Sequence, residues 1–207
     1  MSKKEYQSYE YIDPDAIYTY PNSDVLINKF GLTDAARAYE MEYESVLMRL
    51  LELEVRPIFV HSMKDILRVH AYIFQDIYEW AGQYRKVNIS KQGNAFMAMQ
   101  AFGSAETYMN LLISDFQKNA NNREDIIIHL ARILDNENYF HPFREGNGRT
   151  QREVIRVLGL EKDHRARINL DKNDEIYNLY MDGTVHGDVR KLELLFSKVL
   201  CRAKDFV

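Results

Sequence analysis

The stretch NYFHPFREGNGRTQR, residues 138–152, decides the fold because it joins two apolar helical segments through a short polar loop. The segment before it, 126–137, is apolar on nearly every side, and the helix after it is apolar in its second half, 154–160. We therefore expect both helices at the centre of the domain. Charged residues held between two buried helices break the local pattern, and such a conflict is typical of a functional site.

The backbone of this loop predicts a site for anions. Pro142 ends the incoming helix, and Gly146 and Gly148 let the chain turn and approach a ligand closely before the next helix begins. The first amides of a helix point outward without partners and carry the positive end of its dipole. Phosphate oxygens bind readily at such a position.

The side chains of the loop extend this prediction to a reaction. Arg149 and Arg152 are three residues apart, so they share one face of the first turn and can bind phosphates bidentately. Glu145 is an expected magnesium ligand beside the phosphates, and His141 can accept a proton near neutral pH. Together these groups indicate a nucleotidyl or phosphoryl transferase that works by positioning and charge neutralisation.

Other interpretations of the same residues are weaker. GNGRTQ superficially resembles a dinucleotide fingerprint, but no strand precedes it and Gln151 occupies the third glycine position, so a Rossmann fold is excluded. A purely structural role, with a capping histidine and a surface arginine pair, explains any two of the residues but not all six. The remaining histidines in helical segments lack metal-ligand companions and are predicted to pack or cap: His70, His129 and His186.

Hydrophobic periodicity predicts an all-α single domain spanning 1–207, with no linker or internal repeat. Its core motif region is expected at about 60–160, with N-terminal helices within 22–54 and C-terminal helices within 173–203 packed on it. A small hairpin is predicted at 87–97, and because an isolated hairpin is marginally stable, something must complete it. The expected helices are 23–29, 33–53, 63–77, 104–118, 123–137, 173–182 and 188–203.

Composition excludes several classes of protein. With 27 Lys and Arg against 31 Asp and Glu, the net charge of −4 gives no bulk attraction to nucleic acid. The single cysteine, Cys201, excludes an internal disulfide or a CxxC zinc site and is expected to be buried. No apolar run reaches bilayer length and no apolar signal segment follows the first lysines, so a cytoplasmic protein is expected. Five of the fourteen tyrosines, at 6, 9, 11, 18 and 20, are either packing residues or modification sites.

At this point the loop resembles a known family. His141 through Arg149, extended to Arg152, is similar to the full signature of the Fic (filamentation induced by cAMP) domain family, HPFx[D/E]GNGRxxR, and departs from it nowhere. WAGQYRKVNISK at 80–91, with Phe96, resembles the hairpin flap of that family, and NSDVL at 22–26 recurs in its bacterial members. The resemblance implies a helical bundle with a hairpin flap beside the active-site loop.

The resemblance also implies an activity, transfer of AMP from ATP to a hydroxyl of a target protein, with release of pyrophosphate and dependence on Mg²⁺. His141 would deprotonate a Ser, Thr or Tyr hydroxyl, Glu145 would hold the magnesium ion between the α- and β-phosphates, and Phe143 would anchor the loop in the core. A related transferase using another nucleotide or donor, or a nucleotide-binding regulator without catalysis, stays open because nothing in the sequence defines the base pocket.

For the nucleotide, the resemblance implies that Asn147 and the amides around Gly146 and Gly148 hold the α- and β-phosphates. Arg149 would contact the β-phosphate and Arg152 the γ-phosphate. Gly148 favours AMP transfer, because Doc-type relatives that act as kinases carry lysine there. The exposed edge of the hairpin is expected to pair with an extended target segment and to bring its hydroxyl to the base. The residues of this target-docking flap are Val87, Asn88, Ile89, Ser90 and Lys91.

One feature of many Fic proteins is missing. They carry a helix with [S/T]xxxE[G/N], whose glutamate pairs with the second arginine of the motif, here Arg152. No Ser or Thr in this chain has Glu four residues later. The sequence therefore predicts the toxin of a toxin–antitoxin pair, restrained by a separate small helical antitoxin that supplies the glutamate. The resemblance suggests type II topoisomerases as targets.

Overall fold

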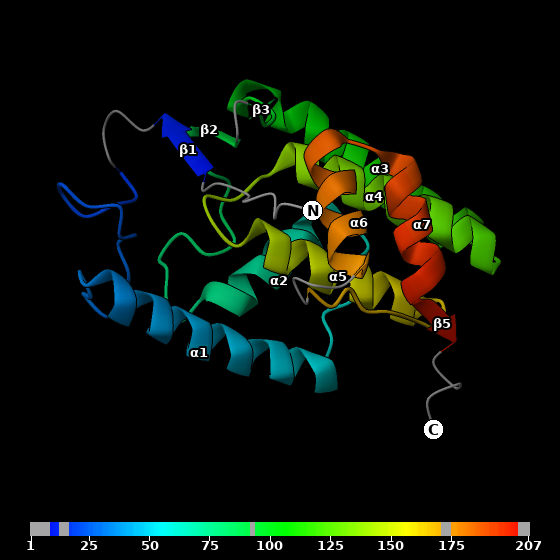
Figure 1. Cartoon of the computed structure of the whole chain (residues 1–207), viewed down its shortest axis with the longest axis horizontal. Helices are drawn as coiled ribbons and strands as arrows, with labels where there is room; N and C mark the ends of the chain where they lie inside the picture. The colour runs from blue at the N-terminus through cyan, green and yellow to red at the C-terminus, as the bar shows by residue number, and fades with distance from the viewer. Residues whose placement is uncertain (1–8, 13–16, 92–93, 171–174, 203–207) are drawn as a thin grey trace.

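The computed structural model describes residues 9–12, 17–91, 94–170 and 175–202. The described chain is mainly helical, as the hydrophobic periodicity predicts, with short strands near its two ends and in the hairpin (Figure 1). The helices are α1 (Ala35–Val55), α2 (Met63–Phe74), α3 (Phe102–Asn119), α4 (Arg123–Phe140), α5 (Asn147–Glu161), α6 (Glu175–His186) and α7 (Val189–Val199), with a 3₁₀ turn, η1 (Met99–Ala101), before α3. The strands are β1 (Tyr9–Ile12), β2 (Asn88–Lys91), β3 (Asn94–Ala95), β4 (His164–Ala166) and β5 (Leu200–Arg202).

Helices α4 and α5 occupy the centre, as expected for the segments on either side of the polar loop. Leu130 and Leu134 of α4 and Val154 and Leu158 of α5 are all fully buried. Helix α2 packs on α5, while α3 and α7 pack on α4. Helix α1 lies along one side of the molecule against α2 (Figure 1). The loop between α4 and α5 is therefore held by the most buried part of the fold.

The predicted long helix is confirmed as α1, whose N-cap Asp34 accepts a hydrogen bond from the backbone N–H of Arg37. The predicted helix at 23–29 is wrong. Its backbone groups bond outside any helix, since the N–H of Ile27 donates to Tyr18 and that of Lys29 donates to Ile77. A bridge between Thr19 and Leu26 shapes this segment instead. Long-range pairing, invisible to local periodicity, decides its conformation.

The hairpin is confirmed, but it is completed by the chain itself. Strand β1 pairs antiparallel with β2, Tyr9 opposite Lys91 and Ile12 opposite Asn88 (Figure 1). The expectation of an exposed strand edge at 88–91 is therefore wrong in this structure. The physical requirement behind that expectation, that a two-stranded hairpin must gain a further contact, is met by β1.

A second small sheet was not expected. The predicted helix 188–203 ends at Val199, and β5 then pairs antiparallel with β4. Ala166 and Leu200 face each other in this pairing and are both buried, so burial of the ladder outweighs the helical periodicity. The predicted start of the preceding helix at 173 lies outside the described residues. None of the helices in the described ranges combines the length and apolar composition that crossing a bilayer requires.

Candidate active site

His141 stands at the C-terminal end of α4 in a left-handed conformation. Its φ and ψ are 47° and 60°, and its backbone N–H donates to the carbonyl of Glu137 at 3.0 Å, which closes the helix. A residue other than glycine rarely adopts positive φ. This conformation lets the chain leave the buried helix sharply and enter the loop at Pro142.

Contacts with two described residues help to orient the ring of His141. Its Nδ1 lies 3.0 Å from the carbonyl oxygen of Asn138, and because a carbonyl only accepts, Nδ1 carries the proton of the neutral ring. Phe96, which follows the hairpin, stacks on the imidazole with the ring centroids 3.8 Å apart. The nitrogen able to accept a proton is therefore Nε2. The geometry gives His141 the tautomer that a general base requires.

Beneath the loop lies a second histidine. Phe143 is 1% exposed and stacks on the ring of His70, with 3.7 Å between centroids. The Nδ1 of His70 accepts from the N–H of Gly82, so Nε2 donates to the carbonyl of Glu145 at 3.0 Å. Burial lowers the pKa of His70 to about 3, which keeps the ring neutral. The expectation that His70 packs is correct, and the structure adds that it holds the loop backbone.

The glycine-bearing turn opens helix α5. Gly146 is the N-cap, with φ of 81°, and a Cβ there would overlap the ring of Phe74. Asn147 is buried, and its side chain both accepts from the N–H of Phe143 at 3.0 Å and donates to the carbonyl of Phe143 at 2.8 Å. The amide of Asn147 thus braces the loop, and its contact with phosphates stays a prediction.

The two motif arginines lie on different sides of α5. The guanidinium of Arg149 sits 4.7 Å over the ring of Phe74 and pairs with Glu42 of α1 at 2.5 Å and with Glu145 at 3.4 Å. Arg152 lies 6.0 Å over the ring of Tyr180 in α6. The expectation that both arginines share one face is therefore wrong for their guanidinium groups: despite the spacing of three residues, Arg149 contacts α1 and α2, whereas Arg152 contacts α6.

Arg152 has no ion pair with any carboxylate in the described part of the chain. One of its nitrogens lies next to Gly148, where an added Cβ would approach Nη1 to 3.3 Å. Gly148 therefore leaves room for the arginine at the start of α5.

Burial works to lower the pKa of Arg149, but the carboxylates of Glu42 and Glu145 outweigh it and raise that pKa above its usual value.

Arg85 connects the loop to the hairpin. It is 2% exposed, and its guanidinium donates to the carbonyls of His141 at 2.8 Å and of Val87 and Met97 at 2.6 Å each. Its backbone N–H also donates to the carbonyl of Pro142 at 2.8 Å. Burial lowers the pKa of Arg85 to about 10, so it remains charged at neutral pH.

The proposed docking residues differ in what they present. Val87 and Ile89 are buried, where they pack with Tyr18 and Phe96, and the side chain of Asn88 accepts from the N–H of Met99. Asn88 and Ser90 are partly exposed, and β1 pairs with the backbone edge of β2. The side chain of Lys91 lies outside the described part of the structure.

Sequence reasoning missed Arg85 and Glu42. Arg85 lies inside the stretch that resembles the hairpin flap, so a charged residue between apolar neighbours was an available signal. Glu42 is one of several glutamates on α1, and only the packing of α1 beside α5's first turn distinguishes it. For Tyr18, the structure favours a packing role over a modification site, because the side chain is buried and its hydroxyl oxygen accepts from the N–H of Lys86.

Two central helices are joined by a histidine-bearing loop, and Arg149 and Arg152 lie near the N-terminus of the second helix. A helix N-terminus with arginines beside it is an arrangement suited to binding phosphate groups. Residues 61–158 of this chain match the model of the Fic/DOC family. This match includes α2, the hairpin, both central helices and the loop between them.

Three relatives illustrate the similarity. The "Probable protein adenylyltransferase Fic" of Escherichia coli is 27% identical over 193 residues, which cover 91% of this chain and 94% of that protein. The protein adenylyltransferase VbhT of Bartonella schoenbuchensis is 31% identical over 149 residues, 70% of this chain and 30% of that protein. The crystal structure of the N-terminal Fic domain of a Bep effector protein from Bartonella quintana, with bound ADP, has a TM-score of 0.79 at 20% identity and covers 91% of this chain and 96% of that one.

Proposed function

We propose that this chain is a protein adenylyltransferase, which transfers AMP from ATP to a Ser, Thr or Tyr hydroxyl of a target protein. The observation that carries the proposal is the pairing of a proton-accepting Nε2 on His141 with a helix N-terminus that begins six residues later. Relatives matching nine-tenths of the chain are named for this activity. A base beside a phosphate site is the minimum that nucleotidyl transfer to a hydroxyl requires.

In this reaction the target hydroxyl gives its proton to Nε2 of His141 as its oxygen attacks the α-phosphorus. A new oxygen–phosphorus bond forms, the bond between the α-phosphorus and the bridging oxygen to the β-phosphorus breaks, and pyrophosphate leaves. The hydrogen bond from Nδ1 to Asn138 stabilises the imidazolium that results. The amides at Gly146 to Gly148, with Arg149 and Arg152 on either side, neutralise the phosphates.

The residues at the loop fit a magnesium ion. Glu145 is partly exposed and lies at the mouth of the turn, and its Oε1 accepts the N–H of Gly146 at 2.9 Å, which orients the carboxylate. Mg²⁺ is usually held by one or two carboxylates together with phosphate oxygens and waters. We propose Glu145 as its protein ligand; the ion supplies charge neutralisation of the α- and β-phosphates.

Glu145→Gln keeps the size of the side chain and removes its charge, so we expect AMP transfer to fall by about 10²-fold, because a metal contributes several kcal/mol of charge stabilisation. Excess EDTA is expected to reduce the parent to a similar level. Rates at several magnesium concentrations measure this. Glu124→Gln, in the first turn of α4 and far along the chain from the loop, is the control. Undiminished transfer in EDTA refutes the metal role.

Labelled ATP tests the reaction itself. The parent is incubated with a cell lysate and ATP labelled once at the α-phosphate and once at the γ-phosphate. We expect protein to acquire the α-label and not the γ-label. A γ-label on protein identifies a kinase, a protein label obtained only with another nucleotide identifies a different donor, and the absence of any label with retained ATP binding identifies a regulator. The labelled band also gives the size of the target.

The target is proposed to dock on the edge of β2, at Val87 to Lys91. Strand β1 supports this, because it demonstrates that the edge accepts an antiparallel strand, with register from Tyr9 opposite Lys91 to Ile12 opposite Asn88. A target segment takes the same backbone hydrogen bonds by displacing β1. Since Val87 and Ile89 are buried, backbone pairing supplies the affinity at this edge.

We also propose a small helical antitoxin as partner and type II topoisomerases as targets, in a cytoplasmic setting. Two observations support the partner. Arg152 pairs with no carboxylate among the described residues, so its restraint would come from another chain. Helix α1 exposes apolar side chains at a spacing of four residues, a face that a helix can cover. These residues are Tyr39, Tyr43, Leu47, Leu51 and Val55.

A further inference from the structure

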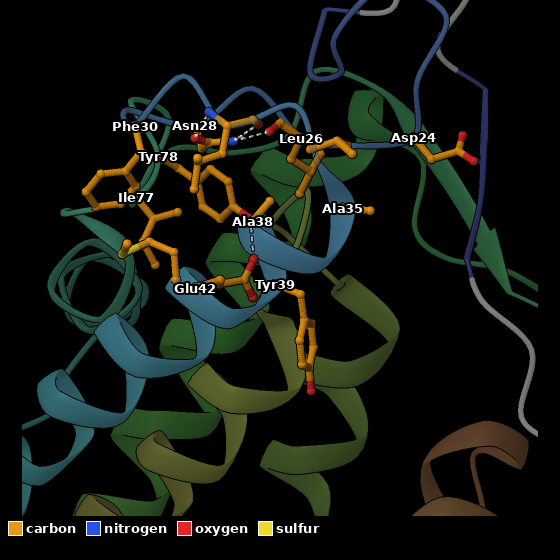
Figure 2. Close-up of a pocket in the computed structure, with 13 residues that line it drawn as sticks. Asp24, Leu26, Asn28, Phe30, Ala35, Ala38, Tyr39, Glu42, Ile77 and Tyr78 are labelled. Atoms are coloured by element: carbon orange, nitrogen blue, oxygen red, sulfur yellow. Dashed lines mark hydrogen bonds between the residues drawn. The ribbon is translucent and has the colours of Figure 1, made fainter.

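Glu42 reaches the nucleotide loop from a helix outside the family's signature. Its side chain is 16% exposed, and Oε1 lies 2.5 Å from Nη1 of Arg149. The other oxygen, Oε2, accepts the hydroxyl proton of Tyr78, the contact drawn as a dashed line in Figure 2. Burial, together with Glu42, raises the pKa of Tyr78, so the phenol stays a donor at all relevant pH. Both carboxylate oxygens of Glu42 are thus used.

Arg149 lies between two carboxylates of unequal distance. Oε1 of Glu42 lies 2.5 Å from Nη1 of Arg149, whereas Oε1 of Glu145 lies 3.4 Å from Nη2, which is long for a hydrogen bond. The ring of Phe74 lies under the guanidinium at 4.7 Å and fixes its plane. Arg149 is therefore held toward α1 and away from Glu145.

Removing Glu42 changes this balance. Glu145 is four residues before Arg149, so it becomes the remaining carboxylate beside the guanidinium among the described residues. A guanidinium prefers bidentate pairing with a carboxylate, which uses both of its outer nitrogens and both oxygens. The oxygens of Glu145 would then be shared with the arginine, and fewer N–H groups of Arg149 would remain for a phosphate.

We propose that Glu42 is a positioning residue, which holds Arg149 against Phe74 so that Glu145 keeps its charge for the metal and Arg149 keeps donors for the β-phosphate. This inference rests on the proposed function of the loop. The five N–H donors of a guanidinium allow one edge to bind Glu42 while the others point to the nucleotide. Tyr78 completes the arrangement, because its hydroxyl fixes the carboxylate of Glu42 from the far side.

The opposite role would be competition, in which Glu42 keeps Arg149 from the nucleotide. The two roles predict opposite signs. Without Glu42, a positioned arginine loses affinity for a β-phosphate, whereas a restrained arginine gains it. A merely structural role of α1 would alter the binding of every nucleotide equally, including AMP, which has no β-phosphate.

Calorimetric titration of the full chain with ADP and with AMP, each in magnesium and in EDTA, separates these cases. For Glu42→Ala we expect the Kd of ADP in magnesium to rise about tenfold, the typical worth of one charge-assisted hydrogen bond, with the Kd of AMP unchanged. Glu42→Gln, which can still accept from Tyr78, is expected to lie between the parent and the alanine variant. In EDTA the difference between Glu42→Ala and the parent is expected to shrink, because Glu145 then has no ion to hold.

Glu44→Ala is the matched control, because Glu44 lies on the same helix, is exposed and has no ion pair among the described contacts. It is expected to bind both nucleotides as the parent does. Unchanged or tighter ADP binding in both Glu42 variants overturns the proposal, as does an equal loss for AMP and ADP. If Glu42→Ala does not fold, Glu42→Gln gives the answer. A parent that binds no ADP at all contradicts the proposed function and not the role of Glu42.

Discussion

We expect His141→Ala to lower the rate of AMP transfer by about 10²–10⁴-fold, the usual cost of losing a general base, while ADP binding stays near that of the parent. In the proposed mechanism, Nε2 of His141 would act on the attacking hydroxyl, whereas the helix N-terminus and the arginines would bind the nucleotide. Single-turnover transfer of α-labelled AMP gives the rate, and calorimetry gives the ADP affinity.

The left-handed backbone at His141 calls for a second variant. Alanine tolerates φ of 47° poorly, but asparagine adopts this region readily, so His141→Asn removes the base and keeps the turn. Both variants are expected to lose transfer equally. Expression of the parent alone is expected to arrest growth, and expression of either variant is not. Transfer at the parent's rate in the asparagine variant shows that another group is the base.

Gly146→Ala is expected to destabilise the fold by about 3 kcal/mol, because the new Cβ overlaps the ring of Phe74 and positive φ adds backbone strain. For a chain of this size such a loss corresponds to a drop in Tm of roughly 10 °C. Nucleotide binding is expected to fall as well, since the turn precedes the first amides of α5. Thermal unfolding followed by circular dichroism measures the change.

Two other glycines separate the causes. Gly31 has φ of 66° with nothing within 4 Å of an added Cβ, so Gly31→Ala reports the backbone strain without the overlap. Gly103, near the start of α3, has neither feature, and its replacement by alanine is expected to be neutral or slightly stabilising. If Gly146→Ala lowers the Tm by no more than Gly31→Ala does, the overlap with Phe74 contributes nothing to the loss of stability.

Local sequence signals predicted the helical body and the loop well, because their determinants are close in the chain. Caps, apolar periodicity and the two glycines of the motif act over a few residues, so α1, α2 and the turn between α4 and α5 followed from them. The segment at 23–29 and the pairing of β4 with β5 depend on partners far away along the chain. No local pattern contains that information.

The same distinction applies to the site. The residues from His141 to Arg152 are contiguous, so their chemistry could be inferred together. Glu42 joins them across more than a hundred residues, and β1 meets β2 across nearly eighty, as the pairing of Tyr11 with Ile89 shows. Periodicity marks α1 as a helix but does not say which of its glutamates meets Arg149. The parts of the site that depend on tertiary packing were therefore outside its reach.

Arg85 fixes the position of the hairpin relative to His141. Its guanidinium binds the carbonyl of His141 and the carbonyls of Val87 and Met97 on both sides of the hairpin, so the imidazole and the strand edge are parts of one rigid frame. A docked segment advances about 3.3 Å per residue, and a slip of one residue turns every side chain to the opposite face. With target docking on β2, the enzyme would thus choose its hydroxyl by counting positions along a strand, and serine, threonine and tyrosine would compete on placement and not on chemical identity.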